Sequence, residues 1–457
     1  MNKPTNKKPR LKRVLGRFDV VSLGFGAMIG WGWVILAGLW ISQAGVLGAS
    51  LAFFLGSIAI IVIGLTYAEL ASALPFAGGE HAYTERAFGK TVSFICTWSI
   101  IFGYVSVVAF EAIALPVAVV YLFPEFKIAP LWVVAGYTVH ASEVALGAGG
   151  AILITMINIL GVRVAARVQS VVLVLILLAG LVLLSGSATS MNAMHFDQPA
   201  WKGLAGVFSV IVMVPFLFVG FDVIPQSAEE IDAPKREIGR ALVQSIIFAV
   251  IFYLLIVFAV GLAPASKDSF DLAAADAAGA YWSSRTAAQF IVIAGIGGIL
   301  TSWNAFLIGG SRAVFALARS GQLPAFLGKV HPNFGTPWPA ILLIGILSVF
   351  APMLGRNALV WIVNAGGFSI VVAYLFVAAA FLKLRRSEPL LERPYKTPGG
   401  VLTGVAALIF SIALLALYLP GSPAALQWPH EWGLLAVWFG LGLLFLLMAR
   451  NKSESNK

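Results

Sequence analysis

The 457-residue chain contains very little cysteine and very little charge. Cys96 is its only cysteine, which excludes an intrachain disulfide and a metal site built from thiolates. Only 11% of the residues are charged, whereas soluble globular domains average about 25%. The low charge therefore excludes a water-soluble protein of this size.

Histidine and nucleotide-binding motifs are also scarce. The five histidines lie in different segments, and no two have the spacing of metal ligands. The sequence contains no phosphate-binding loop, dinucleotide fingerprint or catalytic triad motif. We therefore predict no metal, no cofactor and no enzyme activity, and we expect no transport driven directly by ATP hydrolysis.

Apolar segments are abundant, since 60% of the residues are hydrophobic. Many of these segments approach the ~20 residues that cross a bilayer as a helix. Lipid cannot hydrogen-bond to exposed backbone, so each is expected to be helical. The sequence predicts an all-α integral membrane protein with twelve transmembrane helices. They are expected at residues 19–44, 48–73, 91–122, 142–161, 166–187, 203–228, 237–264, 287–318, 338–354, 358–383, 400–420 and 431–450.

The basic residues fall mainly on one side of this topology. Of the 30 Lys and Arg residues, five lie on one side and the remaining 25 on the other. Basic loops stay in the cytoplasm, so we expect cytoplasmic tails at 1–17 and 451–457 around a transmembrane transporter domain at 18–450. The net charge of +10 is then a topology signal in a multi-pass plasma-membrane protein, and no nucleic-acid partner is predicted. The five exceptions are Lys127, Lys202, Lys267, Arg285 and Arg356.

Two apolar segments contain glycine clusters where a membrane helix should be continuous. The first runs from Gly24 to Gly32 and the second from Pro215 to Asp222. Unpaired backbone groups cost several kcal/mol each in lipid, so such breaks occur where protein or a polar cavity surrounds them. Close helix packing through small residues is the alternative explanation. Two breaks in corresponding helices favour a solute site.

The positions of the breaks predict an inverted repeat. The first and the sixth helix are broken, so each opens a unit of five helices. An odd number of spans makes the second unit enter the membrane from the opposite side. We expect repeat one at 18–187, repeat two at 203–383, and helices 11–12 at 400–450.

The broken helix ends offer groups for both ends of a zwitterion. A second half-helix beginning near Gly30 would present free N–H groups and a partial positive charge, which attract a carboxylate. Carbonyls at the ends of the preceding half-helices would accept from an ammonium group. The expected donors are the N–H groups of Gly30, Trp31 and Gly32, and the expected acceptors are the carbonyls of Ala27, Met28, Ile29, Phe218 and Val219.

Two carboxyl groups belong to this predicted site. Glu111 lies in the middle of the third helix, where a charge costs at least ~2.5 kcal/mol. It is expected either to bind a cationic amine, to carry a proton, or to be a protonated carboxyl bonded to nearby backbone. Asp222 follows the second break and could bind substrate, receive a proton or cap the next half-helix.

Five stretches of the chain carry a family pattern. They are GFGAMIG (24–30), YAELASALPFAGGEHAYTERAFG (67–89), GFDVIPQSAEEIDAPKREIGRAL (220–242), GGSRAVFALARSGQLP (309–324) and RPYKTPGG (393–400). With these stretches the chain resembles the amino acid–polyamine–organocation superfamily of secondary transporters over nearly its whole length. The resemblance implies a five-plus-five inverted repeat that moves amino acids or amines by alternating access. It also implies that Phe216, Phe218, Phe221 and Phe306 occlude the substrate, and that Thr301, Ser302 and Asn304 face the unwound first helix.

Two positions depart from the family pattern. Trp31 replaces a small hydroxyl residue, so its ring either lines the pocket or packs against protein or lipid. Ile176 stands where some relatives have a lysine whose ammonium replaces a sodium ion. Sodium at Thr301 or Ser302, proton coupling through Glu111 or Asp222, exchange and facilitated flux therefore stay open.

Polar residues near the predicted cytoplasmic side are expected to have structural roles. The loop at 77–89 is amphipathic and predicts a short interfacial helix. Glu69 is expected in a structural network. Glu229 and Glu230 are expected to be solvated partners of the basic residues at 235–236, either structural or forming and breaking an inner gate.

The sequence thus predicts a secondary active transporter, either a permease or an exchanger. Its partners would be an amino acid or related small amine, the lipid bilayer and H+ as a candidate coupling ion. One alternative is a polyamine or amine transporter whose substrate has no carboxylate. A more distant alternative is a solute-binding nutrient sensor.

Overall fold

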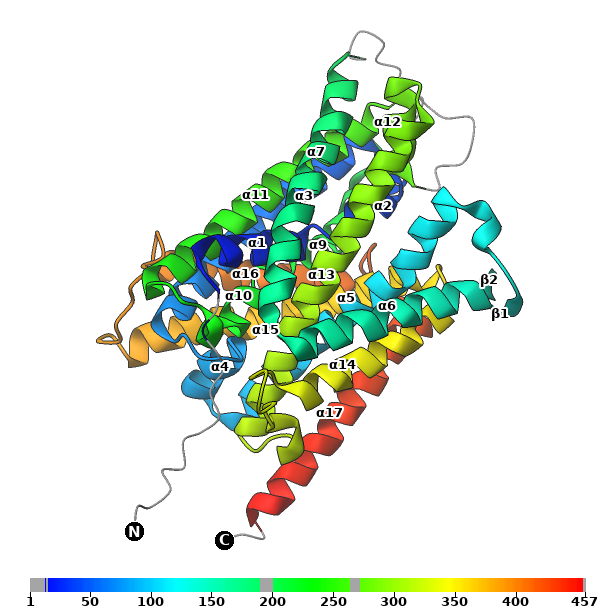
Figure 1. Cartoon of the computed structure of the whole chain (residues 1–457). Coiled ribbons are helices and arrows are strands. Elements are labelled where there is room, and N and C mark those ends of the chain that lie inside the picture. The colour runs from blue at the N-terminus through cyan, green and yellow to red at the C-terminus, as the bar shows by residue number, and fades with distance from the viewer. Residues whose placement is uncertain (1–12, 14, 190–199, 264–271, 455–457) are drawn as a thin grey trace.

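A computed structural model describes residue 13 and residues 15–189, 200–263 and 272–454, which are almost entirely helical (Figure 1). In this part of the chain, 11 helical segments are long and apolar enough to span a membrane. The twelfth expected span is a shorter apolar helix at Trp338–Leu354. The all-α membrane fold is confirmed. Most of the tail at 1–17 lies outside the described residues.

The first two expected spans are joined without a loop. They comprise α1 (Arg17–Met28), α2 (Gly32–Ile35) and α3 (Ala37–Ala73). The chain reverses inside α3 at Gly45, which has φ +73°. Only glycine adopts this conformation without a steric penalty. A tight glycine turn therefore replaces the loop expected between the first two helices.

The sixth span consists of three short helices. They are α8 (Leu204–Ile211), α9 (Val214–Phe218) and α10 (Val223–Gln226). Residues 219–222 between α9 and α10 are not helical. Both breaks that the sequence predicted are therefore present, one in the first span and one in the sixth.

The other elements are long helices joined by short connections. The interfacial helix expected at 77–89 is α4 (Glu80–Phe88). The remaining elements are α5 (Lys90–Leu122), η1 (Pro124–Phe126), β1 (Pro130–Val134), β2 (Tyr137–His140), α6 (Ala141–Leu160), α7 (Val162–Thr189), η3 (Ala228–Glu230), α11 (Lys235–Gly261), α12 (Ala273–Trp282), α13 (Arg285–Arg319), η4 (Ala325–Gly328), α14 (Trp338–Phe350), η5 (Ala351–Leu354), α15 (Ala358–Ser387), α16 (Val401–Tyr418) and α17 (His430–Glu454).

The two ends of the helix bundle differ in structure. Figure 1 shows α12 and the antiparallel hairpin β1–β2 at one end, called the α12 side, and α4 at the other, called the α4 side. Neither α12 nor the hairpin was predicted. The phenol of Tyr121 in α5 donates to Oδ1 of Asp276 in α12 at 2.7 Å. Asp276 therefore fixes α12 on α5.

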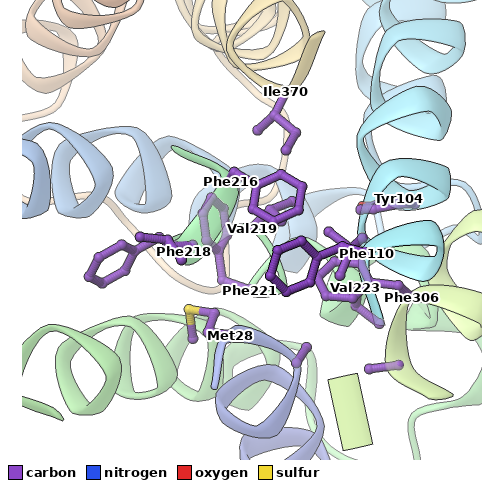
Figure 2. Close-up of a cluster of buried hydrophobic side chains, with 14 of the residues drawn as sticks. Met28, Tyr104, Phe110, Phe216, Phe218, Val219, Phe221, Val223, Phe306 and Ile370 are labelled. Carbon is purple, nitrogen blue, oxygen red and sulfur yellow. The ribbon is translucent and has the colours of Figure 1, made fainter. Parts of the chain in front are cut away.

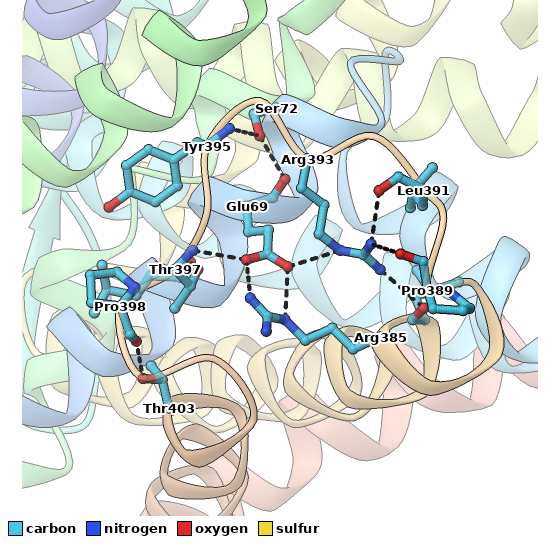
Figure 3. Close-up of polar contacts among 12 residues, drawn as sticks. Glu69, Ser72, Arg385, Pro389, Leu391, Arg393, Tyr395, Thr397, Pro398 and Thr403 are labelled. Carbon is cyan, nitrogen blue, oxygen red and sulfur yellow. Dashed lines mark hydrogen bonds and ion pairs between the residues drawn. The ribbon is translucent and has the colours of Figure 1, made fainter.

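Buried and half-buried ion pairs lie on the α4 side, and Figure 3 shows those around Glu69. Oε1 of Glu69 accepts from Nε of Arg385 at 2.9 Å and lies 3.1 Å from Nε of Arg393. Its other oxygen accepts from the Thr397 N–H at 2.8 Å. Glu69 thus attaches the segment between α15 and α16 to the end of α3, which agrees with its predicted structural role.

Two further ion pairs join the sixth span to α13. Glu230 accepts from Nε of Arg312 at 2.7 Å, and Glu229 pairs with Arg319 at 3.4 Å. The expected pairing of both glutamates with residues 235–236 is therefore wrong. Sequence proximity misled the prediction because the arginines come from a helix some 80 residues further along the chain.

Candidate substrate site

The break in the first span is a three-residue interruption between α1 and α2. Helix α1 ends at Met28, and Ile29 has φ −104° and ψ 67°, which is not helical. Helix α2 begins at Gly32, two residues later than expected. The Met28 carbonyl accepts from the Tyr253 hydroxyl at 2.8 Å. One of the predicted acceptors is therefore already paired with protein.

The break in the sixth span lies directly against the first. Gly220 has φ +131°, and a Cβ atom on it would lie 2.8 Å from Cβ of Ala27 and 2.9 Å from N of Met28. Contacts under 3.0 Å do not occur at real Cβ atoms. Glycine is therefore required at this position both by the backbone conformation and by the close approach of the two unwound segments.

A small cavity of about 20 Å³ lies beside these breaks. This volume holds about one water molecule. The rings of Phe110 and Phe216, with centroids 5.6 Å apart, belong to the apolar cluster in Figure 2. Seven predicted residues line the cavity, together with five that were not predicted to bind substrate. The seven are Ala27, Met28, Gly30, Gly32, Glu111, Phe216 and Phe306, and the five are Val107, Phe110, Leu217, Tyr253 and Ser302.

Glu111 occupies the N-terminal end of α2. Its carboxyl group faces the Trp31 N–H and the hydroxyl of Ser302. A methyl group on Gly30 would overlap with Oε1 of Glu111. Only 1% of Glu111 is exposed, and its Oε2 atom has no hydrogen-bond partner among the described residues. A side-chain carboxyl thus sits where the sequence predicted a substrate carboxylate.

Trp31 and Phe218 are buried beside the cavity but do not line it. The Trp31 ring packs against Gly295 of α13, and its indole N–H has no partner within the described chain. The Phe218 ring lies 5.0 Å from that of Tyr253. Ile29 and Val219 are also buried outside the lining. These side chains support the walls of the cavity.

Phe221 and Asp222 lie on the α4 side of the cavity. The Phe221 ring is 5.3 Å from that of Tyr67 and 5.5 Å from that of Tyr374. Oδ1 of Asp222 accepts from the Gly220 N–H at 2.8 Å, and no side chain caps α10. Asp222 therefore stabilises the break itself and does not cap the half-helix that follows.

The three polar residues expected in α13 face different partners. The Thr301 hydroxyl donates to the Gly298 carbonyl at 3.1 Å, and the Gly26 carbonyl of α1 lies 3.4 Å away. Ser302 contacts Glu111, as described above. Asn304 accepts from Asn158 of α6 at 2.8 Å and so faces away from the unwound first helix.

Tyr253 and Phe110 could not have been identified from the sequence. Each is an aromatic residue in an apolar helix, which is more often a packing residue. The Tyr253 hydroxyl must find a partner in a membrane span, but the sequence does not show that the partner is Met28. Ser302 was expected only as a coupling residue, since its contact with Glu111 depends on how α5 and α13 pack.

A second cavity of about 310 Å³ lies on the α12 side. Its lining includes the charged residues Lys127, Glu143 and Arg356, along with Tyr121 at the end of α5. The small central cavity thus has a larger, charged cavity on one side and the ion pairs of Glu69, Glu229 and Glu230 on the other.

Comparison with known proteins identifies the family. A family model described as amino acid permease matches residues 15–443. The chain belongs to the amino acid permease family. It is therefore a member of the amino acid–polyamine–organocation superfamily, a multi-pass membrane protein and a secondary transporter of an amino acid or related small amine, not an enzyme.

Relatives of this permease have different named substrates. A branched-chain amino acid permease of Bacillus subtilis is 28% identical over 99% of this chain and 96% of that protein. A methylthioribose transporter of the same organism is 25% identical with the same coverage. An aspartate-proton symporter, also from Bacillus subtilis, is 27% identical over 89% of this chain and 79% of that protein.

Proposed function

We propose that this permease carries a small amine-bearing solute across the plasma membrane by alternating access, with both chain ends in the cytoplasm. The solute would bind between the break in the first span and α9, in the cavity that contains Glu111. The two discontinuous spans support this assignment most strongly, because they bring two non-helical backbone segments together beside a cavity.

In this proposal the broken first and sixth spans, one from each of the repeats at 18–187 and 203–383, move together relative to the surrounding helices and carry the bound solute between the two sides. The charged cavity on the α12 side would face the outside of the cell, and the ion pairs on the α4 side would form the closed inner gate.

H+ is the coupling ion we favour, because Glu111 is a buried carboxyl group in contact with the site. The aspartate-proton symporter among the relatives is consistent with this choice.

The position of Glu111 favours a second candidate function, transport of an amine that has no carboxylate. Its carboxyl group faces the Trp31 N–H, which is the donor otherwise available to a substrate carboxylate. No Lys, Arg or His lines the central cavity in the described structure, so Glu111 is the charged group that a bound cation would meet. A zwitterionic amino acid would have to displace Glu111 from α2.

Uptake into proteoliposomes tests both functions. The purified permease would be supplied with radiolabelled neutral amino acids, cationic amino acids and the corresponding decarboxylated amines. Saturable uptake with counterflow is expected for at least one class. An open channel or a non-transporting sensor would show no counterflow, and either result would reject the proposal.

The Glu111→Ala variant separates the two substrate classes. If the solute is an amino acid, the variant frees the Trp31 N–H and is expected to bind the carboxylate more tightly. If the solute is a simple amine, the variant loses the only counter-charge in the cavity and binding is lost. Binding that is unchanged for every class would show that Glu111 is structural.

A further inference from the structure

A second buried polar group lies on the α4 side of the central cavity. This inner cluster consists of six residues from α3, α4, α5, the region of α10, and α15, and none of the six has measurable solvent exposure. Tyr104 precedes Glu111 by seven residues in α5, which is about 10 Å along the helix. The cluster is therefore separate from the substrate cavity. Its members are Tyr67, Glu80, Tyr104, Asp222, Gln226 and Tyr374.

Few polar atoms of the inner cluster are hydrogen-bonded. Nε2 of Gln226 donates to Oε2 of Glu80, and the Gly220 N–H donates to Oδ1 of Asp222. In the described chain, Oε1 of Glu80, Oδ2 of Asp222 and Oε1 of Gln226 have no well-formed hydrogen bond, and neither do the three tyrosine hydroxyls, although Tyr67 faces Glu80 and Tyr104 faces Asp222. Each unmet buried group costs roughly 1–3 kcal/mol. Such a concentration of oxygen atoms indicates a ligand that is positively charged or donates hydrogen bonds.

No described cationic side chain neutralises the two carboxyl groups. The titratable groups that interact with the pair are Tyr67, Tyr83, Cys96, Tyr104 and Tyr374, all neutral in their ordinary protonation state. The neighbouring charges have other partners. Arg312 of α13 pairs with Glu230, Arg385 of α15 pairs with Glu69, and Nδ1 of His81 in α4 lies 2.7 Å from the Ser93 hydroxyl.

Two charged carboxylates in this setting would be very unstable. Removing even one from water costs several kcal/mol when no partner charge compensates it. Burial raises the pKa of Glu80 above its ordinary value, and the neighbouring Asp222 raises it further. Two carboxyl groups that share a dry site commonly hold one proton between them. Tyrosine hydroxyls can donate to the charged carboxyl or accept from the protonated one.

We propose that Glu80 and Asp222 form a shared proton-binding site on the α4 side of the substrate cavity, which takes up a proton from one side of the membrane and releases it to the other during transport. Asp222 connects this site to the substrate cavity, because its Oδ1 atom binds the Gly220 N–H and Gly220 packs on Ala27 and Met28. A change in the unwound segments would therefore change the hydrogen bonding of the proton site. The proposal rests on the proposed transport function and adds Glu80 as a coupling residue.

The first test measures coupling by the full-length permease in sodium-free proteoliposomes. An inward proton gradient is expected to accelerate wild-type uptake. In Glu80→Gln this acceleration should be lost while substrate counterflow persists. Glu85→Gln is the matched control, because Glu85 lies on the same helix but is partly exposed and outside the cluster; it should keep the acceleration. Equal acceleration in wild type and Glu80→Gln would overturn the proposal.

The second test does not require transport, so it separates failure of the proton site from failure of the proposed function. Infrared difference spectra of the purified protein at neutral pH should contain a protonated carboxyl band that Glu80→Gln lacks. If that variant does not fold, Asp222→Asn should remove the same band. A missing band in the wild type would reject the shared proton.

Sodium binding is tested by tryptophan fluorescence of the same purified protein at constant pH. If sodium changes the fluorescence of the wild type but not that of Glu80→Gln or Asp222→Asn, the cluster binds a sodium ion and the proton proposal is overturned.

Discussion

At the scale of single residues, the pair formed by Arg312 and Glu230 provides a direct test of buried charge. Arg312 is completely buried and 4% of Glu230 is exposed. Removing one member of such a pair leaves an uncompensated charge, so Arg312→Ala should lower the free energy of unfolding by about 3–5 kcal/mol. Thermal unfolding in detergent measures the loss. The half-exposed pair of Arg86 and Glu388 is the control, and Arg86→Ala should cost at most about 1 kcal/mol.

Gly220 should be the least replaceable residue of the second break. Its positive φ and its approach to Ala27 both exclude a side chain, so Gly220→Ala is expected to cost roughly 1–3 kcal/mol of stability. It should also abolish substrate binding, measured by radioligand or thermal-shift titration. Gly149→Ala is the control, because a methyl group at Gly149 meets open space. A Gly220→Ala protein that binds normally would contradict our placement of the site.

Side-chain identity was easier to predict than side-chain contacts. The sequence identified Glu111 as a buried carboxyl because a charge in a long apolar segment is costly. It could not identify the neighbours of Glu111, because they come from the first break and from α13. Glu80 was part of a recognised motif, yet its burial depends on how α4 packs between distant helices.

At the scale of secondary-structure elements, α4 should make the stability of the protein depend on pH. Burial lowers the pKa of His81 to about 4, whereas the unfolded chain has a value near 6.5. Between these values the unfolded state binds more protons. The contribution of His81 to the free energy of unfolding is therefore fully present above about pH 6.5. It is lost as the pH decreases toward 4, by about 3 kcal/mol in total. Melting temperatures across this range should drop in the wild type and drop less in His81→Gln. Parallel curves for the two proteins would exclude His81 as the cause.

Element prediction succeeded where length and hydropathy were sufficient. The spans and both breaks follow from apolar runs of about 20 residues and from glycine clusters. The helix α12 and the hairpin β1–β2 were missed, because short elements outside the membrane have no length requirement. The turn at Gly45 was missed because it interrupts an otherwise continuous apolar stretch.

At the scale of the whole molecule, the orientation in the membrane can be tested with single cysteines. Cys96 is buried, and its thiol lies 3.7 Å from the Ala373 carbonyl. In a Cys96→Ala background, Glu125→Cys and Glu392→Cys introduce exposed thiols on opposite faces of the proposed topology. A membrane-impermeant maleimide should label position 125 in intact cells and position 392 only after lysis. The reverse pattern would invert the assigned topology.

The contact between the two unwound segments also limits how the protein can move. Because Gly220 has no side chain, the sixth span contacts the first directly at the level of the binding cavity, with no room for even a methyl group between them. Sliding of one span along the other would break this fit, whereas rotation of both as a single rigid body would keep it. The bound solute would then stay with this pair of helices throughout the cycle. Their rotation against the surrounding helices would expose the solute first to one side of the membrane and then to the other.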